Sequence, residues 1–156
     1  MNAASRQIPA DLSVDSDFFD LIVGCYARLT GTPLIAGALG PDWLYDHAPF
    51  AVLAHNTDAD PRFIYANRTA QACFEYPLDE FVTLPSRLSA EAPDRAERQR
   101  LLDEVIRNGF VADYAGIRVA KSGRRFRIEN GVVWQLIDDA GTLHGQAATF
   151  SAWHDI

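Results

Sequence analysis

Apolar residues occupy nearly every second position in three successive segments between residues 110 and 153, and a short turn sequence separates each pair. The segments are FVADYAGIRVA, RRFRIENGVVWQLI and LHGQAATFSAW, and the turns contain KSG and DDAG. Side chains of a β-strand alternate between its two faces, so a period of two is typical of a strand with one buried face. Short turns that contain glycine join neighbouring antiparallel strands. The C-terminal part of the chain is therefore predicted to form a three-stranded antiparallel meander.

The middle strand also carries most of a basic cluster, defined here as Arg118, Lys121, Arg124, Arg125 and Arg127. Strict alternation places Phe126, Ile128, Asn130, Val132, Trp134 and Leu136 on one face of this strand, and Arg125 and Arg127 on the other. The cluster is a candidate nucleic-acid patch, but the whole chain of 156 residues has a net charge of -7. An acidic domain is a poor binder of polyanions. We therefore expect the cluster to be the solvated face of a hairpin, paired with acids, and nucleic-acid binding is disfavoured.

Two shorter apolar runs, FAVLAHN at 50–56 and RFIYAN at 62–67, precede the meander. Asp58, Asp60 and Pro61 lie between them and favour a turn, so these runs are predicted to form a β-hairpin. Two short helices follow, one in RTAQACFEY with Asn67 as its N-cap and one in PLDEFVTL that begins near Pro77.

The longest helix is predicted over residues 95–108, with Asp94 as its N-cap and Gly109 just beyond its end. Its apolar stripe is expected to consist of Leu101, Leu102, Val105 and Ile106.

A further amphipathic helix is predicted over residues 16–29, because apolar residues recur there at three and four positions. Ser16 or Asp17 would cap its start, and Gly31 would follow its end. The expected domain division is a flexible tail at 1–15, the helix and a glycine- and proline-rich linker at 16–42, and the main domain at 43–153. The helix is either part of the core or an interaction surface.

The order helix, two strands, helices, three strands predicts an α+β fold with a five-stranded antiparallel sheet and helices on one face. FIYANRTAQACFEYPLDEF and SGRRFRIENGVVWQLIDDAGTLHGQAATF resemble the early and late parts of a PAS domain. The segments APFAVLAHNTDADPRFIYANRTAQACFEY, LPSRLSAEAPDRAERQRLL and GQAATF resemble a PAS-related family, the MEKHLA domain. This family occurs alone in bacteria, usually with an N-terminal helix, and at the C-terminus of plant class III homeodomain-leucine zipper proteins. The resemblance runs from about Trp43 to Phe150, and we assign the bacterial stand-alone form.

The resemblance implies a sensory or interaction role without catalysis, and a cavity between the inner face of the sheet and the helices. The residues expected in the cavity wall are Leu53, Phe74, Phe126, Trp134, Gln146 and Thr149. A filled core is the alternative, since large aromatic residues usually pack against one another. A candidate polar site comprises His55, Asn67 and Arg87. The alternative is a structural role for these side chains, in which His55 forms a hydrogen bond with the backbone at a strand end and Arg87 pairs with a carboxylate.

Cofactors and metals have few candidate ligands in this sequence. The Asn-Cys-Arg-Phe run of flavin-binding PAS relatives is absent, and residues 94–109 contain no histidine of the kind that haem-binding relatives use. Flavin and haem are therefore disfavoured, the cofactor is unknown, and no metal site is expected, since no two histidines have ligand spacing. No GxSxG, HExxH, GxGxxG or P-loop motif is present. The alternative function is a small enzyme that acts on an apolar metabolite with His144 and Glu129 as its titratable pair.

The expected partners are a small-molecule ligand, together with a second copy of the chain bound through helix 16–29 or a protein partner. Cys25 and Cys73 are too far apart in sequence for a CxxC motif and are expected to be buried free thiols. The first residues lack the pattern of a signal peptide, and the apolar run LIVGCYA is too short to cross a bilayer. A cytoplasmic location without membrane contact is therefore expected.

Overall fold

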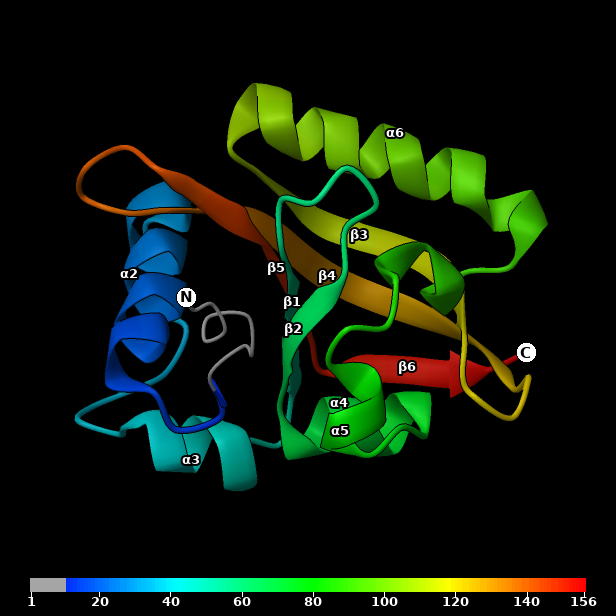
Figure 1. The fold of residues 1–156 in the computed structure, drawn as a ribbon, viewed down its shortest axis with the longest axis horizontal. Coiled ribbons are helices and arrows are strands. Elements are labelled where there is room, and N and C mark those ends of the chain that lie inside the picture. Colours follow the sequence, from blue (N-terminus) through cyan, green and yellow to red (C-terminus); the bar gives the residue numbers. More distant parts are fainter. Residues whose placement is uncertain (1–10) are drawn as a thin grey trace, which may run out of the picture.

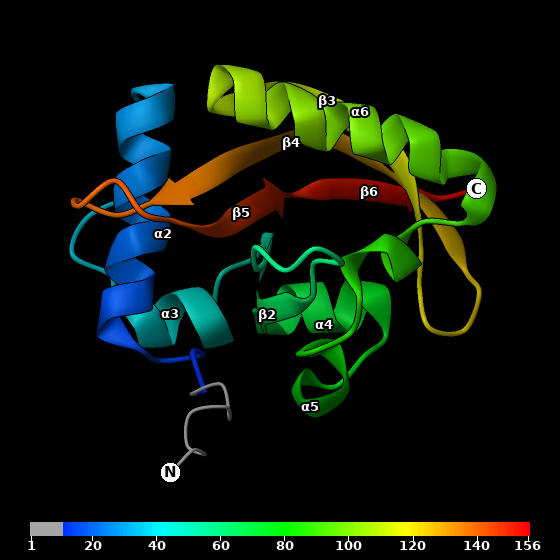
Figure 2. The same ribbon diagram turned by 45° about the horizontal axis from the view of Figure 1, so that its top comes forward.

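The computed structural model describes residues 11–156, and within α6 it does not describe the side chains at positions 92 and 93. One antiparallel sheet has the strand order β2-β1-β5-β4-β3, and β6 pairs with β4 (Figure 1). The strands are β1 Ala51–His55, β2 Phe63–Ala66, β3 Phe110–Val119, β4 Arg125–Ile137, β5 Leu143–Phe150 and β6 Ala152–Asp155. The predicted hairpin, meander and five-stranded sheet are confirmed. The sixth strand continues the line of β5 and pairs with the first half of β4 (Figure 2).

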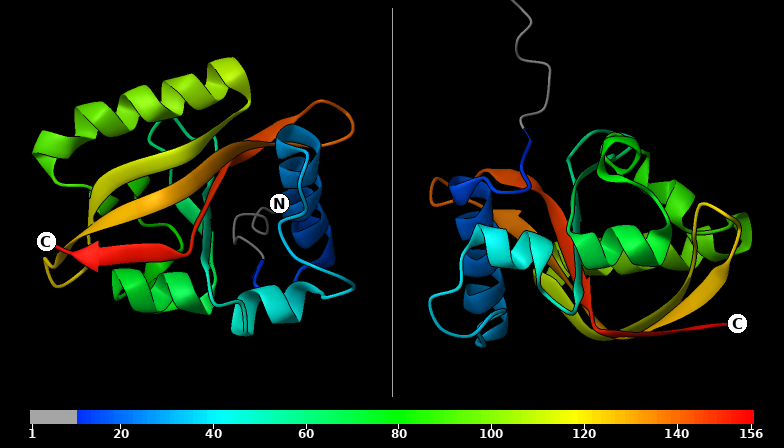
Figure 3. Two further views of the ribbon diagram at one scale, coloured as in Figure 1. Left: turned by 180° about the vertical axis from the view of Figure 1, so that it is seen from behind. Right: turned by 90° about the horizontal axis from the view of Figure 1, so that it is seen from below.

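Helices cover both faces of the sheet. They are α2 Ser16–Thr30, α3 Pro41–Asp46, α4 Arg68–Phe74, α5 Leu78–Phe81, the 3-10 turn η1 Ser86–Ser89, and α6 Ala92–Asn108. We call the face under α4, α5 and α6 the inner face, and the face under α2 and α3 the outer face (Figure 3, right). The PAS-like α+β architecture is confirmed, and the N-terminal helix adds a layer on the side opposite the other long helix.

Several helix boundaries differ from those expected. The longest helix, α6, begins at Ala92 with Glu91 as its N-cap residue, because a proline can lie in the first turn, where no backbone N–H is needed. Asp15, not Ser16 or Asp17, caps α2, and its carboxylate accepts a hydrogen bond from the Phe18 N–H at 2.8 Å. Helix α3 forms at Pro41 at the end of the expected linker. The tail expected over 1–15 lies mostly outside the described residues.

The N-terminal helix is part of the core. Its buried residues Phe18, Ile22 and Cys25 pack in one cluster with Trp134 and Leu136 of the outer face. The ring of Tyr26 meets that of Trp134 edge-on, with 4.9 Å between centroids. Gly31 ends the helix in the left-handed conformation at φ 78°, as expected. The apolar stripe of α2 is therefore occupied within its own chain, and a homodimer through this helix would have to use its other side.

Strand β4 changes face at Asn130, which has a φ of 53°. Before it, Phe126 and Ile128 pack in the inner cluster with Phe74, and after it Trp134 and Leu136 pack in the outer cluster. A one-residue irregularity reverses the alternation of a strand, and here β3 and β4 shift register in the same place. The expectation that Phe126 and Trp134 share a face is therefore wrong.

Candidate functional site

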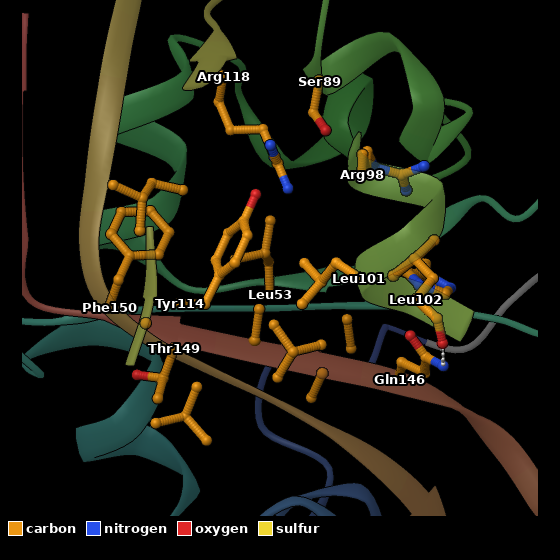
Figure 4. Close-up of a pocket in the computed structure, with 18 of the residues that line it drawn as sticks. Leu53, Ser89, Arg98, Leu101, Leu102, Tyr114, Arg118, Gln146, Thr149 and Phe150 are labelled. Carbon is orange, nitrogen blue, oxygen red and sulfur yellow. Dashed lines mark hydrogen bonds between the residues drawn. The ribbon is translucent and has the colours of Figure 1, made fainter. Parts of the chain in front are cut away.

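A cavity of about 70 Å³ lies between the inner face of the sheet, β3 and α6 (Figure 4). Most of its wall is apolar and comes from the sheet and from α6. The lining residues include Leu53, Ala54, Phe63, Phe74, Leu101, Leu102, Ile128, Val133, Ala148, Thr149 and Phe150. Polar side chains also reach it, namely His55, Ser89, Arg98, Tyr114, Arg118 and Gln146. An apolar chamber with a few placed polar groups is typical of small-molecule sites.

Four of the six residues expected in the cavity wall line it: Leu53, Phe74, Gln146 and Thr149. Phe126 lies behind this wall, with its ring centroid 5.1 Å from that of Phe74. Trp134 is fully buried on the outer face under α2 and does not reach the cavity. Phe126 and Trp134 are thus part of the filled core that was the alternative.

Two arginines form a positively charged end of the cavity, which we call the arginine pole. Arg98 of α6 and Arg118 of β3 are each only 7% exposed. Arg98 donates a hydrogen bond to Ser86 Oγ at 2.5 Å, and Arg118 donates one to its neighbour's carbonyl, Ile117 O, at 2.9 Å. Both acceptors are uncharged, so neither bond neutralises a guanidinium.

Neither arginine has an acidic partner within 4 Å among residues 11–156. Residues 1–10 contain no Asp or Glu, so the remaining residues supply none either. The pKa of Arg98 is lowered to about 10, mainly by burial and next by the positive charge of Arg118. The two guanidinium groups therefore repel one another in a site where water screens charge poorly.

Hydroxyl groups complete the arginine pole. Tyr114 points its hydroxyl toward Arg118, and Ser89 lies between Arg118 and Arg98 (Figure 4). The Tyr114 hydroxyl is buried and has no hydrogen-bond partner among the described residues. Burial raises its pKa and outweighs the opposing effect of the Arg118 charge. Gly116 makes room for this ring, because a Cβ there would lie 2.0 Å from the Tyr114 oxygen.

The other end of the cavity is uncharged. Gln146 donates a hydrogen bond to Leu102 O at 3.4 Å, but its Oε1 atom is buried without a partner in the described part of the chain. His55 lies nearby, with Nδ1 3.0 Å from Asn56 O. Because a carbonyl can only accept, Nδ1 carries the proton in the neutral ring and Nε2 is a free acceptor. Burial lowers the pKa of His55, and the charge of Arg98 adds to this effect.

A protein-family model described as the MEKHLA domain matches residues 16–155. The chain belongs to the MEKHLA family. The homeobox-leucine zipper protein ATHB-9 of Arabidopsis thaliana is 30% identical over 115 residues. That alignment covers 70% of this chain, which spans only 13% of the length of the plant protein.

Solved structures share the PAS fold with this MEKHLA domain. A PAS domain of a protein from Colwellia psychrerythraea has a TM-score of 0.57 at 16% identity, covering 72% of this chain and 90% of the other. The photo-excited blue-light photoreceptor Vivid has a TM-score of 0.54 at 19% identity, covering 83% of this chain and 92% of the other. At such identities the likeness establishes the fold alone.

The candidate polar site of His55, Asn67 and Arg87 does not come together in the MEKHLA domain. Asn67 is fully buried, caps α4 through the Ala70 N–H and accepts from the Val52 N–H, so it ties the helix to β1. Arg87 is exposed and pairs with Asp60 at 3.2 Å, as the structural alternative had it. Of the three, His55 alone reaches the cavity. It also lines, with Arg87, an open groove of about 340 Å³ on the outside of the cavity wall.

The basic cluster divides into two parts. Four members pair with acids at the surface: Lys121 with Glu80, Arg124 with Glu75 and Asp155, Arg125 with Glu91, and Arg127 with Glu129. The expected solvated hairpin face is confirmed for these four. For Arg118 the expectation is wrong, because its side chain turns inward to the cavity.

The titratable pair of the enzyme alternative is not formed. His144 lies 2.7 Å from Asp138 in the β4–β5 turn, whereas Glu129 lies near Arg127 and His154.

Cys25 and Cys73 are buried and free, as expected, and burial raises the pKa of Cys73 to about 12. Within residues 11–156, the side chains of His, Cys, Asp and Glu form no cluster of three that could hold a metal ion. Nor is any helix in that range both long and apolar enough to cross a membrane.

Sequence periodicity could have located the arginine pole. Arg98 falls at helical spacing with Leu101, Leu102 and Val105 and belongs to the buried stripe of the helix. Ile106, which was expected in that stripe, is 59% exposed. Arg118 alternates with Gly116 and Ala120 along β3, all three buried. A charged residue at a buried position of an apolar stripe indicates a polar site in the core. A prediction that considers only the apolar residues of the stripe overlooks it.

Proposed function

We propose that this MEKHLA domain is a non-catalytic sensory module that binds a small molecule in its inner cavity. The observation that carries the proposal is the arginine pole: two buried arginine residues, without acidic partners, at one end of an apolar chamber. Buried charges are costly unless they are paired, and charged groups kept in such places are usually functional. The signal would pass to a partner protein or to a second copy of the chain.

Two finer assignments belong to the same proposal. The domain acts in the bacterial stand-alone manner, which is supported by the N-terminal helix that packs onto its outer face. It works in the cytoplasm, which is supported by two buried cysteines that are free.

Mass spectrometry of the protein purified from its native host tests the proposal. Comparison of native with denaturing spectra should show excess mass that is lost on denaturation, together with the oligomeric state. The same measurement on a variant with a filled cavity, Ala148→Leu, should show less of that mass. A bare polypeptide mass for the unaltered protein, with no stabilisation by any small molecule in a thermal-shift screen, would contradict ligand binding.

A further inference from the structure

We infer that the ligand of the inner cavity is a short organic carboxylate, held by Arg98 and Arg118 at the arginine pole. This inference rests on the proposed function and names the chemical class of its ligand. The observations behind it are the charge of the pole, its unused hydrogen-bond donors, and the size and polarity of the remaining cavity.

The charge of the pole calls for an anion. Both arginine residues are only 7% exposed, and each makes a single hydrogen bond to a neutral oxygen among the described residues. A guanidinium has five N–H donors in a planar fork that matches the two oxygens of a carboxylate. The nearby acid Asp60 is exposed and already bound to Arg87. The anion must therefore come from outside the chain.

The Tyr114 hydroxyl supports the same assignment. It lies at the pole, points toward Arg118 and has no partner in the described part of the chain (Figure 4). Its pKa is raised, so it is a protonated donor at neutral pH. Two donors from β3 and one from α6 thus line one end of the cavity, as a carboxylate site requires.

The size and the walls of the cavity describe the rest of the ligand. A volume of about 70 Å³ is less than half that of an engineered cavity of ~150 Å³ that binds benzene, so the acid must be short. Leu53, Leu101 and Phe150 form the wall next to the pole and would contact an aliphatic body. A large or highly charged phosphorylated metabolite fits neither this volume nor these walls.

The ligand has a route to the pole from the open groove outside. His55, Arg98, Leu102 and Gln146 line both the groove and the cavity, so they form the wall between the two. The bond from Gln146 to Leu102 O, at 3.4 Å, is the one direct hydrogen bond that joins β5 to α6 across this wall in the described residues. Arg98 is the one member of this wall that also belongs to the arginine pole.

Thermal unfolding and calorimetric titration with sodium acetate, propionate and butyrate test the inference, at an ionic strength held constant with sodium chloride. Propionamide is the matched neutral probe, since it has the shape of propionate without the charge. We expect saturable stabilisation by one or more of the acids and none by propionamide or by chloride alone. This arm uses the unaltered protein and needs no variant.

Variants then locate the site. Arg98→Met and Arg118→Met should each weaken carboxylate binding by roughly 10- to 100-fold, the usual effect of losing a charged hydrogen bond in a buried site. Tyr114→Phe should weaken it several-fold with the fold intact. Arg127→Met, which removes a surface-paired arginine of the neighbouring strand, is the control and should leave binding unchanged.

The outcomes separate this inference from the proposed function. If native mass spectrometry finds a neutral ligand and no acid binds, the carboxylate assignment is wrong and the sensory proposal stands. If acids stabilise the protein equally in the Arg98→Met and Arg127→Met variants, they bind elsewhere and the assignment is again wrong. If neither acids, neutral probes nor native ligands bind, both proposals fail together.

Discussion

The hairpin face and the inner cavity each contain arginines, but those on the hairpin are paired with acids and those in the cavity are not. On the hairpin, Arg124 lies between Glu75 and Asp155, and Arg125 and Arg127 each have a carboxylate within 3.3 Å. In the cavity wall, Arg98 and Arg118 are both buried without an acidic partner, and the charge of Arg118 lowers the pKa of Arg98. The ion pairs account for the position of the surface arginines, which have a structural role. Unpaired buried arginines lower the stability of the fold, and we expect them to be present because they bind a ligand.

The largest expected effect comes from removal of the two buried charges. The double substitution Arg98→Met and Arg118→Met should raise the free energy of unfolding by about 1–4 kcal/mol, since well-packed apolar residues often replace buried ions with a gain. Arg125→Met with Arg127→Met on the hairpin should lower it by about 1 kcal/mol or less. Urea unfolding measures both. A loss of stability in the cavity variant as large as that of a core truncation would show that these arginines hold the fold together.

The second effect is a dependence on pH at the cavity. His55 has a lowered pKa in the folded state, so below its ordinary value of 6.5 the unfolded chain binds a proton that the folded chain does not. Stability should therefore fall as the pH drops below 6.5, with a slope of at most about 1.4 kcal/mol per pH unit. The His55→Gln variant should lack this contribution. Parallel curves for the variant and the unaltered protein between pH 7 and 5 would contradict it.

The third effect concerns the best-supported arginine of the hairpin. Arg124 binds Glu75 and Asp155 and also donates to the Cys73 carbonyl at 2.5 Å, which ties the β3–β4 turn to the end of α4. Arg124→Met should lower the free energy of unfolding by about 1 kcal/mol, at the upper end for a partly exposed pair. Chemical denaturation beside Arg127→Met measures the difference. Equal effects of the two substitutions would mean that the extra contacts of Arg124 add nothing.

The smallest effect is that of salt. Exposed pairs such as Lys121 with Glu80 lose attraction when the ionic strength rises, because the Debye length falls from about 10 Å at 0.1 M to about 3 Å at 1 M. Stability should change by a few tenths of a kcal/mol, and the hairpin variants should reduce the change. In the cavity variants the salt dependence should match that of the unaltered protein, since buried charges are screened less. A salt response that disappears with Arg98 and Arg118 would reverse this assignment.

Much of the fold could be predicted from local pattern. Apolar residues at nearly every second position in 110–120 and 143–150 predict the outer two strands of the meander, and the position of Asn67 predicts the cap of α4. The family motifs extended this to the PAS-like sheet with its inserted helices. Apolar periodicity predicts helices such as α2 because they bury one side, which repeats apolar residues at three and four positions in the sequence.

The candidate site was only partly predictable. Leu53, Phe74, Gln146 and Thr149 line the cavity as expected, but the left-handed residue Asn130 moved Trp134 to the other face. The extra residue of a β-bulge changes the side of every residue after it, and alternation counted along the sequence cannot detect that change.

The sequence by itself determined the kinds of elements, their order and the acidic character of the chain. Only the tertiary structure decided which arginines would be paired. Arg118 and Arg124 look alike in the sequence, six residues apart, yet one is buried at the cavity and the other is held by two carboxylates. The reason is physical: an ion pair depends on acids that lie far away along the chain, such as Glu75 and Asp155, and folding alone brings them within reach.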